Sequence, residues 1–426
     1  MVRHGATASN ETMESVALLV QDSENKSNVA HVQATDVAQP TKILFLDGVR
    51  GLAAILVVTQ HSHEYMQDVN LGACAVDSFF VLSSFLLTML FMKKSMKLLA
   101  QGTNYRKWAF TLADYFSKRF FRVYPLFTLV SLLLWMLPDD EKSLYYRMEQ
   151  PENFDLYKVL TFDFDHRYFV LWTLPLEITY YFFIPVFVLV ILKLQKLWWV
   201  SFIPAYGWVV YEGWNGIRWN GMGLLPHAPT FLAGSLAAVI FVKLDAWMKN
   251  NNLELQPKTL HAIRAVEMVA LVLILSLSFQ GLFFIWVHAN IAPQTPGFPF
   301  ISVLLTVVLV IEMILPSALS GVLEWSALRY FGKVSFSIYL LHAFVIYNDA
   351  ITDQPGYYDR FFSRFGLTLL LATVSYHIVE FPSQLLAQYI SRELNHREAH
   401  RSTGMMNFVV CKTRPRQTTK KAAWSV

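Results

Sequence analysis

Charged residues are scarce in this chain. Only 15% of its 426 residues are Asp, Glu, Lys or Arg, whereas soluble domains carry about 25%. A soluble protein of this length would need a charged surface to cover its core, so the composition excludes a water-soluble protein. The net charge of +4 is too small and too scattered for a nucleic-acid surface, so we expect no nucleic acid as a partner.

Cysteine is nearly absent as well. Cys74 and Cys411 are the two cysteines of the chain, and their unlike contexts exclude a disulfide framework and a Cys-based zinc site. His61 and His63 are two positions apart, and residues with that spacing do not share a helix face. No other cluster of possible ligands stands out, so we expect no metal site.

Hydrophobic residues make up 54% of the chain and form ten runs of near-bilayer length. A helix crosses the hydrocarbon core of a bilayer in roughly 20 residues. The pattern therefore predicts an all-α, polytopic membrane protein with about ten transmembrane helices. The predicted spans are 43–60, 74–92, 123–137, 168–192, 197–214, 225–242, 265–284, 297–316, 334–347 and 365–380.

The distribution of basic residues predicts the orientation. The loops after the even-numbered spans and the C-terminal tail hold 24 of the 35 Lys and Arg residues. Cytoplasmic loops are enriched in these residues, so both termini are expected in the cytoplasm. We divide the chain into a disordered cytoplasmic tail (1–42), a transmembrane domain (43–390) and a basic cytoplasmic tail (391–426), the latter unstructured after about residue 391. Plasma membrane and endoplasmic reticulum predict the same charge pattern.

Ionisable residues within membrane spans are candidates for function. The first span, ILFLDGVRGLAAILVVTQH, carries Asp47, Arg50 and His61. Arg50 and His61 share one helix face and lie roughly 16 Å apart along the axis. Either Arg50 snorkels and His61 caps the span, or the two form a polar track from an anion-binding group to a proton-transfer group.

The segment YFSKRFFRVYP leads into the third span. Arg119 and Arg122 are three positions apart and share a face, and Lys118 adjoins them. Two guanidinium groups at the cytoplasmic start of a helix suit a ligand that bears phosphate. Ordinary positive-inside anchoring explains the same residues equally well.

Two further candidates lie deeper in the predicted spans. Glu177, in LWTLPLEITYYFFIP, has no charged neighbour within three positions, so it needs a partner elsewhere or stays protonated. His342, in GKVSFSIYLLHAF, lies late in the ninth span. Taken singly, a histidine at such a place is more often an interfacial residue than a catalytic one.

Taken together, these segments resemble the acyltransferase 3 family of integral-membrane O-acyltransferases. LDGVRGLAAILVVTQH is similar to the family's opening helix, with the Arg-x10-His pattern at Arg50 and His61. SKRFFRVYPLF resembles its Arg-x-x-Arg signature at Arg119 and Arg122, and the block around Glu177 keeps the first acidic position. DSFFVLSSFLLT, GKVSFSIYLLH and SYHIVEFP complete the ordered set, with departures at Ser84, Ile178 and Phe381.

The resemblance implies transfer of an acyl group, commonly acetyl, from acyl-CoA as co-substrate to a hydroxyl, with no bound cofactor. His61 would act as general base or acyl carrier, with Arg50 and Glu177 assisting, and Arg119, Arg122 and Lys118 would bind the CoA phosphates. Asp47 and His342 are further candidates. The acceptor would be a small metabolite such as a terpenoid or polyketide, or a carbohydrate. The alternative is a proton-coupled transporter of a small solute, because aligned Arg, His and Glu also suit a carrier.

Overall fold

The computed structural model describes residues 43–64, 71–216, 218, 222–252, 255–279, 282–283 and 299–412. All regular elements in these ranges are helices, and they belong to one unit, Leu44–Val426. The predicted N-terminal tail, 1–42, lies outside the described residues. The predicted all-α fold is confirmed for the part of the chain that the structure covers.

A helix lies at every one of the ten predicted spans. Within the described ranges, seven helical segments are long and apolar enough to cross a bilayer, and α12 and α15 are shorter apolar helices. The chain is therefore a multi-pass membrane protein, while its orientation stays a prediction. The span helices are α2 (Leu44–His61), α3 (Leu71–Ala100), α4 (Tyr105–Met136), α7 (Thr173–Lys193), α8 (Trp198–Asn215), α9 (Leu224–Asn250), α10 (Pro257–Ser278), α12 (Pro299–Ile314), α15 (Ser335–Ile346) and α17 (Tyr357–Ser375).

Short helices occupy the connections between these spans. Three of them follow α4, and three flank α15. A 3-10 turn, η2, leads directly into α7, and a π-helical turn, η4, joins α17 to the last helix, α18. Their bounds are α5 (Asp139–Tyr146), η1 (Pro151–Asn153), α6 (Leu156–Leu160), η2 (Phe169–Trp172), α13 (Ala318–Leu323), α14 (Ser326–Lys333), α16 (Asp349–Thr352), η4 (Tyr376–Glu380) and α18 (Phe381–Lys412).

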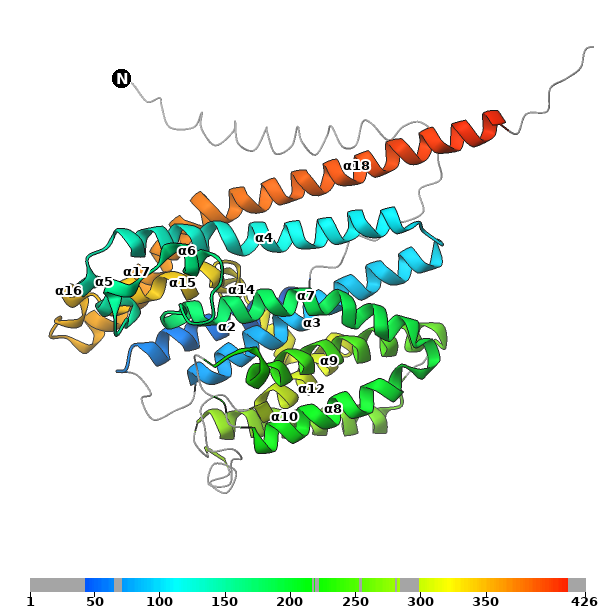
Figure 1. Cartoon of the computed structure of the whole chain (residues 1–426). Coiled ribbons are helices and arrows are strands. Elements are labelled where there is room, and N and C mark those ends of the chain that lie inside the picture. The colour runs from blue at the N-terminus through cyan, green and yellow to red at the C-terminus, as the bar shows by residue number, and fades with distance from the viewer. Residues whose placement is uncertain are drawn as a thin grey trace, which may run out of the picture. The chain divides into compact units, whose positions relative to one another are not determined.

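Several helices run well beyond the predicted spans. α4 begins at Tyr105 rather than near residue 123, and α18 continues as a helix to Lys412, where the sequence predicted unstructured chain. Hydropathy reports only the part of a helix inside hydrocarbon, whereas the backbone bonds continue through polar residues that face water. α4 and α18 pack against each other along this extension (Figure 1).

Helix α2 is held by close backbone contacts. A Cβ atom added to Gly48 would lie 1.7 Å from the carbonyl oxygen of Leu323, and one added to Gly51 would lie 2.0 Å from that of Leu328. A Cβ on Gly332 would lie 1.7 Å from the Asp47 carbonyl oxygen. Only glycine permits this approach of α2 to α13 and α14, so the helix that carries Arg50 and His61 has a fixed place in the bundle.

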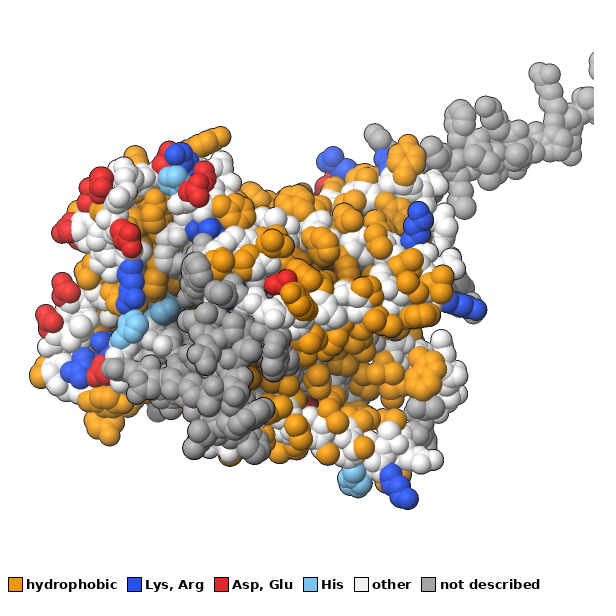
Figure 2. Space-filling model, turned by 60° about the horizontal axis from the view of Figure 1, so that its bottom comes forward, with side chains coloured by type: hydrophobic (Ala, Val, Ile, Leu, Met, Phe, Trp, Pro, Cys, Tyr) orange, Lys and Arg blue, Asp and Glu red, His pale blue; other side chains and the backbone are white. Residues whose placement is uncertain are grey.

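The outside of the bundle is apolar. On α7, for example, Phe182 and Val186 are 62% and 60% exposed, and the space-filling view shows hydrophobic side chains over much of the visible face (Figure 2). A helix that is hydrophobic on its outward face as well as its inward one is typical of a membrane span. The exposed apolar surface therefore matches a lipid environment.

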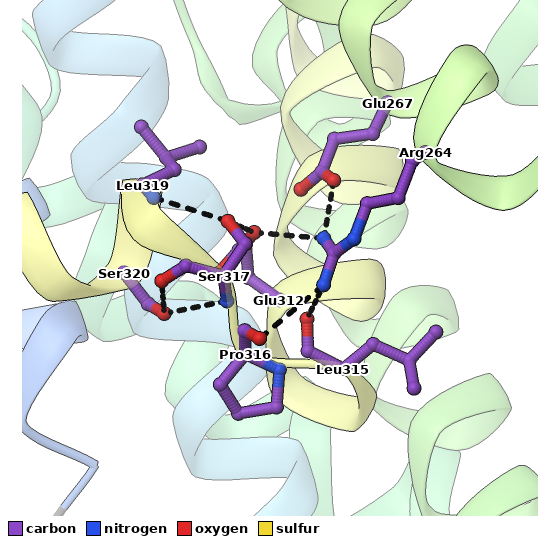
Figure 3. A network of polar contacts seen from close by, with 8 residues as sticks. All are labelled: Arg264, Glu267, Glu312, Leu315, Pro316, Ser317, Leu319 and Ser320. Atoms are coloured by element: carbon purple, nitrogen blue, oxygen red, sulfur yellow. Dashed lines mark hydrogen bonds and ion pairs between the residues drawn. The ribbon is translucent and has the colours of Figure 1, made fainter. Parts of the chain in front are cut away.

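An ionic cluster with two buried carboxylates and a partly exposed arginine joins α10, α12 and α13 (Figure 3). The Arg264 guanidinium donates to the carboxylates of Glu267 and Glu312, the latter at 3.1 Å, and to the carbonyl oxygens of Leu315 and Pro316. Glu312 also accepts from the backbone N–H and the hydroxyl of Ser317. We call this set the Arg264 cluster; it fixes the turn from which α13 begins.

Candidate functional site

A pocket opens between α2, α3, α4, α7 and α15. The space between their side chains, including the open mouth, measures about 760 Å³. Four of the predicted site residues line it, and apolar side chains and hydroxyls form the rest of the wall. The four are Arg50, Arg119, Arg122 and Glu177. The structure thus brings together residues that are up to 127 positions apart in the sequence.

Three arginines give the pocket its positive charge. Arg50 lies 3.6 Å from the Asp47 carboxylate, an ion pair one turn apart on α2. The Nε of Arg119 is buried without a hydrogen-bond partner in the described part of the chain. Arg122 likewise forms no hydrogen bond or ion pair with another described residue. Such guanidinium groups in a concave site attract a polyanionic ligand.

Glu177 is the one carboxylate among the described residues that line this pocket. Its Oε1 accepts hydrogen bonds from the hydroxyls of Ser83 on α3 and Tyr181 on α7, both at 2.5 Å. The partner that the sequence left open is therefore a pair of hydroxyls, which orient the carboxylate within a group of arginines. The sequence did not identify either hydroxyl as a partner of Glu177, although Tyr181 follows Glu177 by one helical turn.

Lys118 does not line the pocket. Its Nζ lies 2.9 Å from the Asp114 carboxylate, which also pairs with Lys94 of α3. Lys118 is 40% exposed. Although it precedes Arg122 by one helical turn, its ammonium reaches back to Asp114, one turn earlier on α4, and not into the pocket. Of the three cationic residues that were predicted to act together, Arg119 and Arg122 line the pocket and Lys118 does not.

His61 and His342 form a histidine pair next to the pocket wall. The Nδ1 of His61 lies 2.9 Å from the Nε2 of His342, and the two rings are nearly parallel with centroids 5.0 Å apart. His342 is fully buried, while His61 is partly exposed. Tyr339 lines the pocket, and its ring centroid lies 6.3 Å from that of His342, so this tyrosine belongs both to the pocket wall and to the surroundings of the histidine pair.

An aromatic and cationic layer covers the other side of the histidine pair. The Phe169 ring lies 4.9 Å from the His61 ring and 5.8 Å from the His342 ring. The Arg147 guanidinium lies 5.7 Å from the Phe169 ring and donates to the Nε2 of His63. Burial, and then the charge of Arg147, lower the pKa of His63, which keeps this imidazole neutral.

The backbone of this layer is strained. His63, Arg147 and Phe169 all have positive φ, at 52°, 50° and 40°. Non-glycine residues rarely adopt this conformation, and where they do they gather at functional sites. Arg147 contacts both His63 and Phe169, so three of the six such residues in the described chain gather beside the histidine pair.

The described residues contain no group of three or more His, Cys, Asp and Glu side chains arranged to hold a metal ion. His63 turns toward Arg147 and His61 toward His342. His61 and His63, although two positions apart in the sequence, therefore contact different residues.

The fold and the pocket define a multi-pass membrane protein with an arginine-lined cavity next to a histidine pair of which one member, His342, is fully buried. A family model for an acyltransferase domain matches residues 43–377 of the 426. The chain therefore belongs to the acyltransferase 3 family.

Individual relatives agree with this family. The chain is 24% identical over 375 residues to a candidate O-acetyltransferase of Staphylococcus aureus (strain COL), covering 79% of this chain and 56% of the relative. It is 25% identical over 365 residues to YrhL, a candidate peptidoglycan O-acetyltransferase of Bacillus subtilis (strain 168), covering 79% and 54%. A shorter match, 35% over 96 residues, is to "Protein 2 in picA locus" of Rhizobium radiobacter and covers 22% and 45%. The chain spans about half the length of the curated relatives it matches.

Proposed function

We propose that this protein is an integral-membrane O-acyltransferase that moves an acyl group, in the first place acetyl, from acyl-CoA to a hydroxyl. The observation that supports it is one arrangement: a pocket with three guanidinium groups and one carboxylate, and next to it the hydrogen-bonded pair of His61 and His342. The family and the relatives named as O-acetyltransferases point to the same chemistry.

The donor would enter from the end where Arg119 and Arg122 lie. CoA carries several phosphate groups, and guanidinium groups without protein partners are their natural ligands. The pantetheine arm would then follow α2 past Arg50 toward His61, a path of roughly 16 Å along the helix axis. Tyr339 would have to rotate or be bypassed for the thioester to reach the histidine pair.

The chemistry would need one proton acceptor. His61 would take the proton from the acceptor hydroxyl as its oxygen attacks the thioester carbonyl, and the proton would return to the departing CoA thiolate. In the second route, His61 itself would carry the acyl group before passing it to the hydroxyl. Both routes yield an O-acyl ester and free CoA.

The acceptor would approach through a polar hollow on the other side of Phe169. This hollow encloses about 1290 Å³ including open space, and Phe169 and Arg147 form part of its wall. Asp155, Lys158 and Asp165 also line it. Charged and amide groups of this kind bind a hydroxyl-rich acceptor better than a terpenoid or polyketide. We therefore favour a carbohydrate-bearing acceptor among the alternatives.

The test is acetyl-CoA binding, measured by calorimetry on purified protein in detergent. We expect saturable binding that weakens at least about 100-fold in the Arg119→Ala/Arg122→Ala double variant, because two charge-assisted contacts are worth roughly 1.5–3 kcal/mol each. The matched control is Lys118→Ala, which removes a neighbouring charge of the same helix outside the pocket and should bind like the wild type.

The opposite outcome is equally informative. If folded wild-type protein binds neither acetyl-CoA nor longer acyl-CoAs, the acyltransferase proposal fails. Solute uptake by proteoliposomes would then favour the proton-coupled transporter. Equal weakening by the Lys118→Ala control would mean that the charge of the whole helix, rather than the pocket pair, binds the donor.

A further inference from the structure

The orientation of His342 is set by the backbone of its own helix. Its Nδ1 lies 3.1 Å from the carbonyl oxygen of Ile338 and 2.9 Å from that of Tyr339. A carbonyl oxygen can only accept a hydrogen bond. The contact is therefore favourable only when the Nδ1 of His342 carries a hydrogen, and this assigns the ring's tautomer from its hydrogen-bond network.

The tautomer of His342 determines the tautomer of the neighbouring His61 ring. A neutral His342 with hydrogen on Nδ1 has a bare Nε2, and this atom lies 2.9 Å from the Nδ1 of His61. A bare nitrogen can only accept, so the Nδ1 of His61 must donate. The Nε2 of His61 is then the ring nitrogen without a hydrogen.

A charged His342 would reverse this assignment, and the surroundings disfavour it. His342 is 0% exposed, and no carboxylate forms an ion pair with it within the described ranges. A buried cation without a partner is costly. The contacts around the pair are instead the aromatic rings of Phe169 and Tyr339, which suit a neutral imidazole.

We infer that His342 is a positioning residue: it holds His61 in the tautomer with hydrogen on Nδ1 and leaves Nε2 as the atom that receives the proton or the acyl group. This inference rests on the proposed function. It is the role that an orienting carboxylate plays beside a catalytic histidine, taken here by a second, neutral histidine anchored on main-chain carbonyls. When His61 gains a proton, the bare Nε2 of His342 still accepts from it.

The direct test does not depend on activity. Protein labelled with 15N-histidine is studied by NMR, and the signals of His61 among the 12 histidines are identified by their loss in His61→Gln. We expect a protonated Nδ1 and an unprotonated Nε2 in the wild type. A protonated Nε2 with a bare Nδ1 would overturn the inference, even if acyl transfer by the protein were established.

Two variants of His342 separate orientation from packing. In His342→Gln the side-chain oxygen can take the place of Nε2 and accept from His61, whereas His342→Leu fills the space without an acceptor. We expect His342→Leu to lower turnover by about 100-fold or more, His342→Gln to keep most of it, and both to bind acetyl-CoA like the wild type. Near-normal turnover by a folded His342→Leu, or equal losses in both variants with binding intact, would refute the role.

If the wild type shows no acyl transfer at all, the proposed function fails while the tautomer measurement still decides the inference about His342. The two failures are therefore distinguishable.

Discussion

Two groups of charged side chains lie within the membrane-spanning part of this protein, and they differ in how their charges are met. In the Arg264 cluster the guanidinium donates to two carboxylates and two backbone carbonyls (Figure 3). In the pocket, Arg119 and Arg122 find no such partner in the described chain. A buried charge that is already satisfied holds helices together, whereas one that is unsatisfied suits a ligand that brings the opposite charge.

The comparison predicts opposite consequences of mutation. Changes at the pocket and the histidine pair should cost function and leave stability nearly intact. Changes in the Arg264 cluster should cost stability and leave donor affinity intact in the molecules that stay folded.

The largest effect is expected at the histidine pair. His61→Ala removes the proposed proton acceptor, so turnover should fall by about 10²–10⁴-fold, while acetyl-CoA binding and the melting temperature should stay close to wild type. Turnover is measured as CoA release, with His63→Ala as the control that removes the neighbouring imidazole. Activity that survives in His61→Ala would move the base to His63 or His342.

The next effect is on stability. Glu312→Leu leaves Arg264 without one of its two carboxylates and deprives Ser317 of its acceptor, so the free energy of unfolding should fall by roughly 3–5 kcal/mol. Thermal unfolding in detergent measures this. The Arg119→Ala/Arg122→Ala variant is the counterpart and should lose less than about 1 kcal/mol, because no described protein partner is left unpaired. Similar losses in the free energy of unfolding of both variants would show that the pocket arginines stabilise the fold as much as the Arg264 cluster does.

A smaller effect on stability is expected at a third charged site, around Glu64. Glu64 accepts from Arg360 and Arg364 at the end of α2, and these hydrogen bonds, Arg360 first, lower the pKa of Glu64 below its usual value. A carboxyl whose pKa is depressed in the folded state adds stability above its unfolded pKa, and this is lost as pH falls through the folded value. Glu64→Gln should therefore cost about 1 kcal/mol at neutral pH and almost nothing in acid.

Melting temperatures as a function of pH check this, with Glu152→Gln as the control at an exposed glutamate of η1. A constant difference between Glu64→Gln and wild type across pH would show that the charge of Glu64 is not what stabilises the contact.

The sequence predicted the helical spans and the pocket's charged residues, but not the contacts between them. Apolar runs reveal helices because lipid demands them, and Arg50, Arg119, Arg122 and Glu177 stand out as charges where lipid was expected. The pairing of His61 with His342 spans 281 positions and depends on how α2 packs against α15, which no local pattern reports. Lys118 lies outside the pocket because its ammonium pairs with Asp114, a contact that charge alone does not reveal.

The glycine contacts of α2 have a consequence for altering the protein by laboratory evolution. Because Gly48, Gly51 and Gly332 leave no room for a side chain, nearly every substitution there should be lost from a variant library before activity is selected. The segments around Asn153 and Asp165 lie in the wall of the polar hollow and contain no glycine. If the acceptor enters there as proposed, diversity aimed at new acceptors belongs in those segments, with the helix that carries Arg50 and His61 left unchanged.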